Sequence, residues 1–125
     1  MPRVLIVDDD PDILALIDRR VRAAGYDAVP AESGEAALSL VAGAGTPDVA
    51  VIDVSMPGIS GLELAEVLRA RSGLHALPIV FLSAGGHQHE VDAGVALGAI
   101  YRTKPFATAD LVAGLETALS ERSSS

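Results

Sequence analysis

Four polar side chains in this sequence each stand immediately after a short run rich in apolar and β-branched residues. They are Asp8 after residues 4–7, Asp53 after 49–52, Ser83 after 79–82 and Lys104 after 100–103. A carboxylate can act as a nucleophile and form an aspartyl phosphate. The transferred phosphoryl group then needs a metal ion, a cation and a hydroxyl to hold its oxygens. These residue types therefore match the parts of a phosphoryl-transfer site.

A second acid, Asp9, directly follows Asp8, and the pair predicts a metal site. Neighbouring carboxylates repel one another unless a cation or a proton intervenes. Mg²⁺ suits such a site best, because it binds through one or two carboxylates, keeps several waters and bridges to substrate phosphate. Taken singly, each residue has a simpler interpretation: the acid pair caps a helix, Asp53 or Ser83 forms a turn, and Lys104 is solvated. Their coincidence at the ends of four runs favours the chemical interpretation.

The runs themselves show no polar alternation, which is typical of strands buried on both faces of a parallel sheet. Capping residues and glycines mark helices between them. The predicted helices run from the Asp10 cap to Gly25, from Ser33 to residues 43–45, and over 61–71, 87–97 and 108–119, with a further strand over 26–31. Strand and helix alternate five times, which predicts an α/β fold with a parallel sheet covered on both sides. Ligands bind at the carboxyl ends of the strands in such sheets. The polar side chains would therefore lie together where the strands end.

Composition narrows the function classes further. The chain has 125 residues, the length of one domain, and no cysteine, which excludes disulfides, thiolate catalysis and thiolate metal sites. No window approaches the ~20 apolar residues of a membrane span, so we expect a soluble, cytoplasmic protein without membrane contact. The net charge of -8 argues against nucleic-acid binding by this domain, because phosphate contacts need clustered lysine and arginine.

Three segments together resemble the receiver domains of bacterial two-component response regulators. They are residues 3–9, which end in Asp8-Asp9; residues 47–64, which contain Asp53 and Met56-Pro57-Gly58; and residues 103–106, which contain Lys104-Pro105. The resemblance covers essentially the whole chain, with a receiver domain over 1–121 and a disordered tail or truncated linker over 122–125. It implies a doubly wound (βα)5 fold, which is a flavodoxin-like or CheY-like three-layer sandwich around a five-stranded parallel sheet.

The resemblance also implies a phosphorylatable signalling switch rather than a turnover enzyme. Asp53 would accept a phosphoryl group from a histidine kinase or a histidine phosphotransfer protein, and the domain would catalyse only its own phosphorylation and dephosphorylation. The resulting change of conformation would control a downstream effector protein or an attached output domain. The oligomeric state stays open at this point.

The resemblance assigns a metal-binding role to the acidic residues. Asp9 and Asp53 would bind Mg²⁺ directly. The backbone carbonyl of Ser55 would complete the protein ligands, and Asp8 would act mainly through water.

The remaining roles concern the switch. Ser83 would move to bond a phosphoryl oxygen, and the rotamer of Tyr101 would follow that movement. Lys104 would pair with Asp53 and, after transfer, with the phosphoryl group. A cis peptide between Lys104 and Pro105 would fix the approach of the lysine.

The sequence also departs from the family pattern. The stretch before Tyr101 is one residue shorter than usual, Arg102 stands where an apolar residue is common, and the loop over 84–89 is rich in glycine. His87 and His89 in that loop lack a third metal ligand nearby, so we interpret them as solvated loop residues.

Two other functions would use part of the same residue set. In a Mg²⁺-dependent phosphatase like the haloacid dehalogenase superfamily, Asp8 would be the nucleophile and Asp10 the acid/base, with Ser83 and Lys104 in support. That function needs a further acidic pair after the lysine and leaves Asp53 without a role. A flavodoxin-like cofactor binder needs a glycine- and hydroxyl-rich phosphate loop after the first strand, where three aspartates stand instead. The identity of the phosphorylated residue distinguishes all three.

Overall fold

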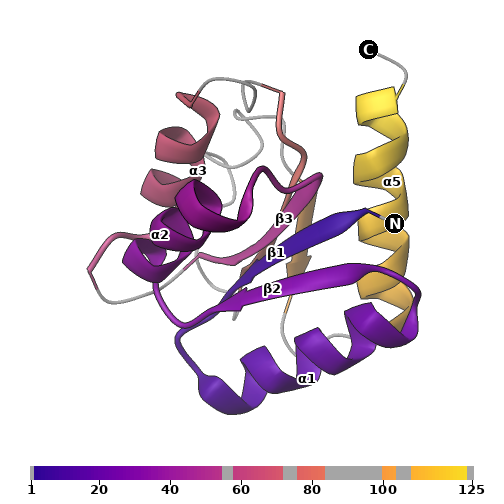
Figure 1. The fold of residues 1–125 in the computed structure, drawn as a ribbon. Helices are drawn as coiled ribbons and strands as arrows, with labels where there is room; N and C mark the ends of the chain where they lie inside the picture. The colour runs from indigo at the N-terminus through magenta and orange to yellow at the C-terminus, as the bar shows by residue number, and fades with distance from the viewer. Residues whose placement is uncertain (1, 55–57, 72–75, 84–99, 104–107, 124–125) are drawn as a thin grey trace.

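A computed structural model describes residues 2–54, 58–71, 76–83, 100–103 and 108–123. Parallel strands form one sheet in the order β2-β1-β3-β4-β5 (Figure 1). The strands are β1 (Arg3–Val7), β2 (Asp27–Ala31), β3 (Val49–Asp53), β4 (Ile79–Ser83) and β5 (Ile100–Thr103). The helices among the described residues are α1 (Pro11–Ala23), α2 (Gly34–Ala44), α3 (Gly61–Arg69) and α5 (Thr108–Ser123).

Helices cover both faces of this sheet and produce three layers (Figure 1). Helices α2 and α3 pack on one face, and α1 and α5 pack on the other. The predicted parallel α/β class is therefore confirmed. The helix predicted over 87–97 lies outside the described residues, so the full set of five βα units stays a prediction. No helix in the described part of the chain is long and apolar enough to cross a membrane.

The central strands explain the unbroken apolar runs of the sequence. Strand β3 is buried throughout, and β1 is buried from Val4 onward. Successive side chains point to opposite faces. Leu5 and Ile52 therefore join the apolar cluster under α2 and α3, whereas Ile6 and Val51 join the cluster under α1 and α5. Because both faces are covered, neither strand has a polar face.

Polar caps begin the helices close to the predicted positions. The Asp10 carboxylate accepts the N–H of Asp12 at 2.9 Å and caps α1, and Ser60 Oγ accepts an N–H of the first turn of α3 at 3.2 Å. Each cap of this kind contributes about 1 kcal/mol. Helix α5 extends to Ser123, beyond the predicted end at Leu119. No glycine or proline follows Leu119 in the sequence, so nothing stops the helix there.

Strand β2 forms one edge of the sheet, and its outer side offers few backbone groups for pairing. Asp27 and Ala31 hydrogen-bond to the residues flanking β1, at 3.0 and 3.2 Å. Backbone groups alternate sides along a strand, so those of Ala28 and Pro30 face the open edge. Pro30 has no N–H. The Ala28 carbonyl accepts a hydrogen bond from the Arg22 guanidinium at 2.9 Å.

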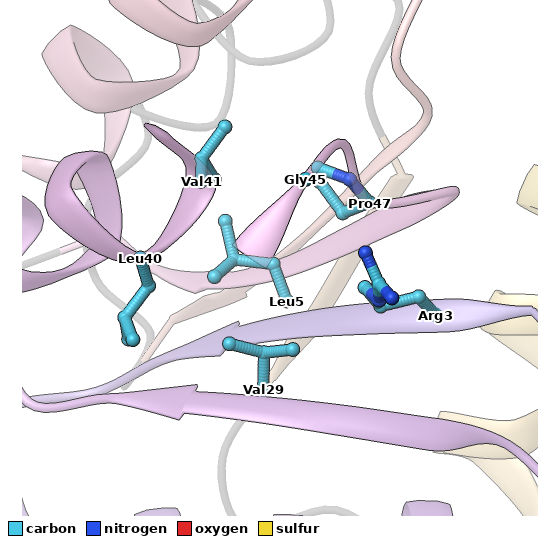
Figure 2. A pocket seen from close by; sticks show the side chains of 7 residues that line it. All are labelled: Arg3, Leu5, Val29, Leu40, Val41, Gly45 and Pro47. Carbon is cyan, nitrogen blue, oxygen red and sulfur yellow. The ribbon is translucent and has the colours of Figure 1, made fainter. Parts of the chain in front are cut away.

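A small apolar hollow lies between α2 and the amino-terminal parts of β1 and β2 (Figure 2). It contains about 180 Å³ of empty space, with its open mouth included. Pockets for organic ligands usually measure ~300–1,000 Å³, so this hollow is too small to be one. The lining residues are Arg3, Leu5, Val29, Leu40, Val41, Gly45 and Pro47.

We expect Val29→Ile to raise the free energy of unfolding by about 0.5–1 kcal/mol, because the added methylene would fill part of the hollow and bury apolar surface. Urea unfolding measures the change. The matched control is Val67→Ile, which makes the same substitution at an exposed position of α3. It should alter stability by less than about 0.5 kcal/mol. A loss of stability in Val29→Ile would show that the hollow cannot accept the extra carbon.

Candidate functional site

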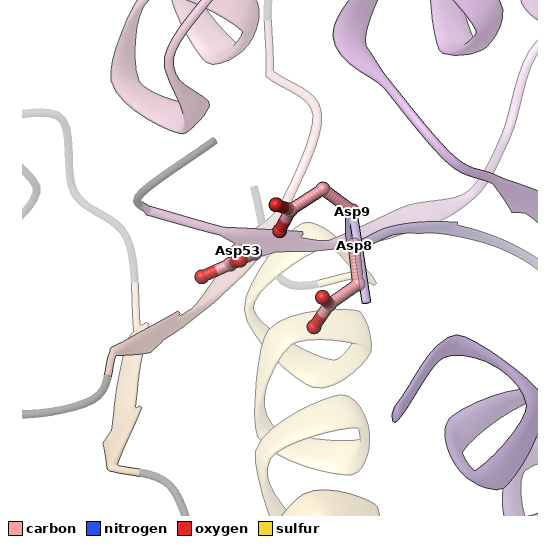
Figure 3. A group of neighbouring side chains, drawn as sticks. All are labelled: Asp8, Asp9 and Asp53. Atoms are coloured by element: carbon pink, nitrogen blue, oxygen red, sulfur yellow. The ribbon is translucent and has the colours of Figure 1, made fainter. Parts of the chain in front are cut away.

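Three carboxylates come together where β1 and β3, neighbours in the sheet, reach their carboxyl ends (Figure 3). Asp8 and Asp9 directly follow β1, and Asp53 is the last residue of β3. One oxygen from each side chain lies within 4.8 Å of the others. Asp8 is fully buried and Asp53 is 6% exposed, whereas Asp9 is exposed to solvent. The cluster therefore has two members inside the protein and one at its surface.

Backbone hydrogen bonds fix the buried Asp8. Its N–H donates to the Ala31 carbonyl at 3.2 Å, and its Oδ1 accepts the N–H of Asp10 at 2.9 Å. The Asp10 carboxylate turns instead to the backbone of α1, which it caps, and it is not part of the three-carboxylate group. The run Asp8 to Asp10 thus divides into a buried acid, an exposed acid and a helix cap.

The backbone of Val54, the residue that follows Asp53, is held from two sides. The Val54 N–H donates to the Leu82 carbonyl at 3.0 Å, and the Val54 carbonyl accepts the N–H of Gly61 at 3.0 Å. A Cβ on Gly61 would overlap the carbonyl oxygen of Asp53 and lie 2.9 Å from the Val54 Cα. Helix α3 can begin this close to β3 only because residue 61 is glycine. This contact was not predicted from the sequence; a glycine directly after the capping Ser60 is the signal that could have indicated it.

The donor set suits a hard divalent cation. Like charges within 4.8 Å of one another repel, so a cation among them lowers their energy. Carboxylate oxygens are the ligands that Mg²⁺ takes in proteins, usually one or two of them together with water. Asp8, Asp9 and Asp53 fit this ion.

The structure places two further predicted residues only through their main chains. Ser83 ends β4, where Asp53 pairs with its neighbour Leu82, so Ser83 lies at the same edge of the sheet as the carboxylates. Tyr101 lies one strand further, in β5, opposite Phe81. The side chains of Ser83 and Tyr101 are outside the described part of the structure. The other predicted residues, Ser55, Lys104 and Pro105, and the loop histidines His87 and His89, also lie outside the described residues.

Comparison with known proteins points to one family. The model of the response regulator receiver domain matches residues 4–116. Transcriptional regulatory protein PrrA of Mycobacterium tuberculosis is 39% identical over 124 residues, which cover 98% of this chain and 52% of that protein. The chain spans about half the length of the curated relatives it matches.

Solved structures agree in fold. Chemotaxis protein CheY4 of Vibrio cholerae has a TM-score of 0.88 and 31% identity, and the match covers 95% of this chain and 99% of that one. Response regulator protein TrrA of Thermotoga maritima, solved in complex with Mg²⁺-BeF, has a TM-score of 0.82 and 34% identity over 95% of this chain and 100% of that one. The architecture is thus the flavodoxin-like α/β fold that CheY proteins share.

Proposed function

The chain belongs to the response regulator receiver domain family, and from that membership we propose that Asp53 is the residue that receives a phosphoryl group. Receiver domains of two-component response regulators are signalling switches of phosphorelays, and this chain is one of them. The observation that carries the proposal is the placement of Asp53, a nearly buried carboxylate at a strand end within 4.8 Å of two other acids.

In the proposed reaction an Asp53 carboxylate oxygen attacks the phosphorus of a phosphohistidine on a partner. The new O–P bond forms as the P–N bond breaks, and the imidazole leaves with the electron pair and takes up a proton. Backbone hydrogen bonds of the next residue, Val54, to β4 and α3 hold the Asp53 main chain in place, which reduces the entropy lost on reaching the reactive geometry. Asp8 and Asp9 would repel the incoming anion, so the transfer depends on a cation.

We propose that Asp9, Asp53 and the backbone carbonyl of Ser55 would hold Mg²⁺ directly. When bound, the ion would neutralise the charge shared by the carboxylates and the phosphoryl oxygens. Asp8 would act mainly through water. Its hydrogen bond to the Asp10 N–H supports this outer role, because one of its oxygens already serves the backbone.

The switch would use residues at neighbouring strand ends. The Ser83 hydroxyl would bond a phosphoryl oxygen, and its main-chain position at the same edge supports that role. Lys104 would pair with Asp53 and, after transfer, with the phosphoryl group. A cis peptide between Lys104 and Pro105 would fix the approach of the lysine. Tyr101 would change rotamer with Ser83. We propose that the domain catalyses only its own phosphorylation and dephosphorylation.

The partners follow from the same proposal. The donor would be a histidine kinase or a histidine phosphotransfer protein. PrrA, about twice the length of the matched region, is named a transcriptional regulatory protein. We therefore propose that this domain controls an attached output domain or a separate effector in the cytoplasm. With a net charge of -8, the receiver itself would not contact nucleic acid.

The phosphatase alternative loses its acid/base residue in this arrangement. That mechanism needs the Asp10 carboxylate near the nucleophile, whereas Asp10 accepts N–H groups of α1 at 2.9 and 3.4 Å. It also gives no role to Asp53.

Treatment with acetyl phosphate tests the proposal. With Mg²⁺ present, we expect a single phosphoryl adduct that peptide mass spectrometry maps to Asp53. Removal of the metal with EDTA should abolish the adduct, because nothing would then offset the repulsion between the acids and the phosphodonor. Adding excess Mg²⁺ back is the control and should restore it. An adduct on Asp8 would contradict the proposal and favour the phosphatase.

A further inference from the structure

The residues just before the cap of α3, Gly58 and Ile59, lie against the first turn of α2. Gly34, the first residue of α2, is buried, and a Cβ placed on it would overlap Cγ2 of Ile59. Beside this contact, a Cβ on Gly58 would lie 3.2 Å from Oε1 of Glu35. Residues 58 and 59 therefore rest directly on the first turn of α2.

Ile59 is linked in turn to the main chain of Asp53. The next residue, Ser60, caps α3, and Gly61 donates its N–H, at 3.0 Å, to the carbonyl of the residue after Asp53. Gly61 lies so close to β3 that a Cβ on it would overlap the Asp53 carbonyl oxygen. Gly34 thus packs against Ile59, and two residues further along the chain Gly61 packs against the peptide of Asp53.

We propose that Gly34 and Ile59 are positioning residues for Asp53. They form a seat through which α2 fixes where α3 begins, and with it the direction of the Asp53 carboxylate relative to Asp8 and Asp9. Neither residue touches the phosphoryl group, and the inference rests on Asp53 being the phosphoacceptor. Densely packed contacts transmit small displacements. A shift of ~1 Å at a reacting group can slow a reaction by up to ~100-fold, so even a small displacement of Asp53 would lower its reactivity.

The fit between the two residues gives the test its direction. A methyl group at position 34 would push Ile59 away, and truncation of Ile59 to alanine would leave a gap. In the double variant, the new methyl group would occupy space that the Ile59 side chain leaves. We expect Gly34→Ala and Ile59→Ala each to slow phosphorylation by acetyl phosphate about tenfold, and the double variant to return to within about threefold of the unsubstituted rate.

A contact that served only the stability of the fold would change the unfolding temperature and nothing else. The rates are therefore compared well below that temperature, with the folded fraction measured by circular dichroism. The dissociation constant of Mg²⁺ for the unphosphorylated protein, from an NMR titration, is the second measurement. This dissociation constant should rise by between a few-fold and about tenfold in each single variant. In the double variant it should return close to the unsubstituted value.

Gly43→Ala is the matched control, because it adds the same methyl group to α2 where nothing lies within 4 Å. It should leave both the rate and the Mg²⁺ affinity unchanged. Losses in the two single variants with recovery in the double variant would support the inference. Unsubstituted rates in both single variants, or losses that simply add in the double variant, would overturn it.

If Gly34→Ala does not fold, Ile59→Ala decides alone: slower phosphorylation with weaker Mg²⁺ binding at an unchanged folded fraction supports the seat, and unchanged values reject it. An unsubstituted protein that takes up no phosphoryl group would overturn the proposed function, and this inference with it, before any variant is compared.

Discussion

The Asp53→Asn variant is expected to acquire no phosphoryl group from acetyl phosphate and Mg²⁺ under conditions that modify the unsubstituted protein. An amide oxygen is a far weaker nucleophile than a carboxylate, and asparagine has nearly the same shape as aspartate. The reaction should therefore be lost while the fold is kept. Intact-mass spectrometry measures the adduct, and the thermal unfolding curve verifies the fold.

The same substitution should also weaken Mg²⁺ binding. Loss of a residue behind a metal ligand typically reduces affinity ~10–100-fold, so loss of a ligand carboxylate should cost at least about tenfold. Asp10→Asn is the control: it makes the same change within the acidic run, and asparagine caps a helix about as well as aspartate. It should be phosphorylated normally. A full adduct on Asp53→Asn, or none on Asp10→Asn, would contradict the assignment of Asp53.

Gly61→Ala is expected to lower the free energy of unfolding by about 3 kcal/mol. The new methyl group would overlap the Asp53 carbonyl oxygen and crowd the Val54 Cα, which are backbone atoms that cannot rotate away. Either the start of α3 or the end of β3 would have to shift, and each is held by packed side chains. Urea unfolding measures the loss.

Gly43→Ala provides the comparison for that loss. Here the added Cβ meets nothing within 4 Å, and the position lies in the last turn of α2. Alanine should stabilise this helix by about 0.5–1 kcal/mol, because it has less backbone freedom to lose. Opposite signs for the two variants would demonstrate that Gly61 is required by a close approach. Unchanged stability of Gly61→Ala would show that α3 has room to move.

The strands and the acidic cluster were predictable because they follow from local rules. An unbroken apolar run suits a strand covered on both faces, and parallel strands end at one edge, so Asp8 and Asp53 were expected to converge. The caps at Asp10 and Ser60 follow from short-range hydrogen bonding. The carboxyl end of α5 was not predictable in this way. A sequence marks a helix end only by a stop signal such as glycine or proline, and none follows Leu119.

Contacts between distant segments were not predictable in the same way. The approach of Gly61 to Asp53, and of Gly34 to Ile59, depends on how closely two elements pack. An apolar pattern encodes which face of an element is buried but not the distance to its neighbour. In the sequence, a glycine required by such a close approach cannot be distinguished from a glycine in an ordinary turn or at a helix start. The roles of the remaining residues, Ser55, Ser83, Tyr101, Lys104 and Pro105, stay predictions.

The β2 edge of the sheet has a consequence for how this domain assembles with other chains. A foreign strand joins a sheet by matching its donors and acceptors to an exposed edge, which is also how fibrils grow. At this edge Pro30 supplies no donor, and the Ala28 acceptor is already engaged by Arg22. An incoming strand therefore meets an interrupted template. This side of the molecule therefore disfavours the binding of a partner by strand addition. It also disfavours the growth of fibrils from copies of the domain.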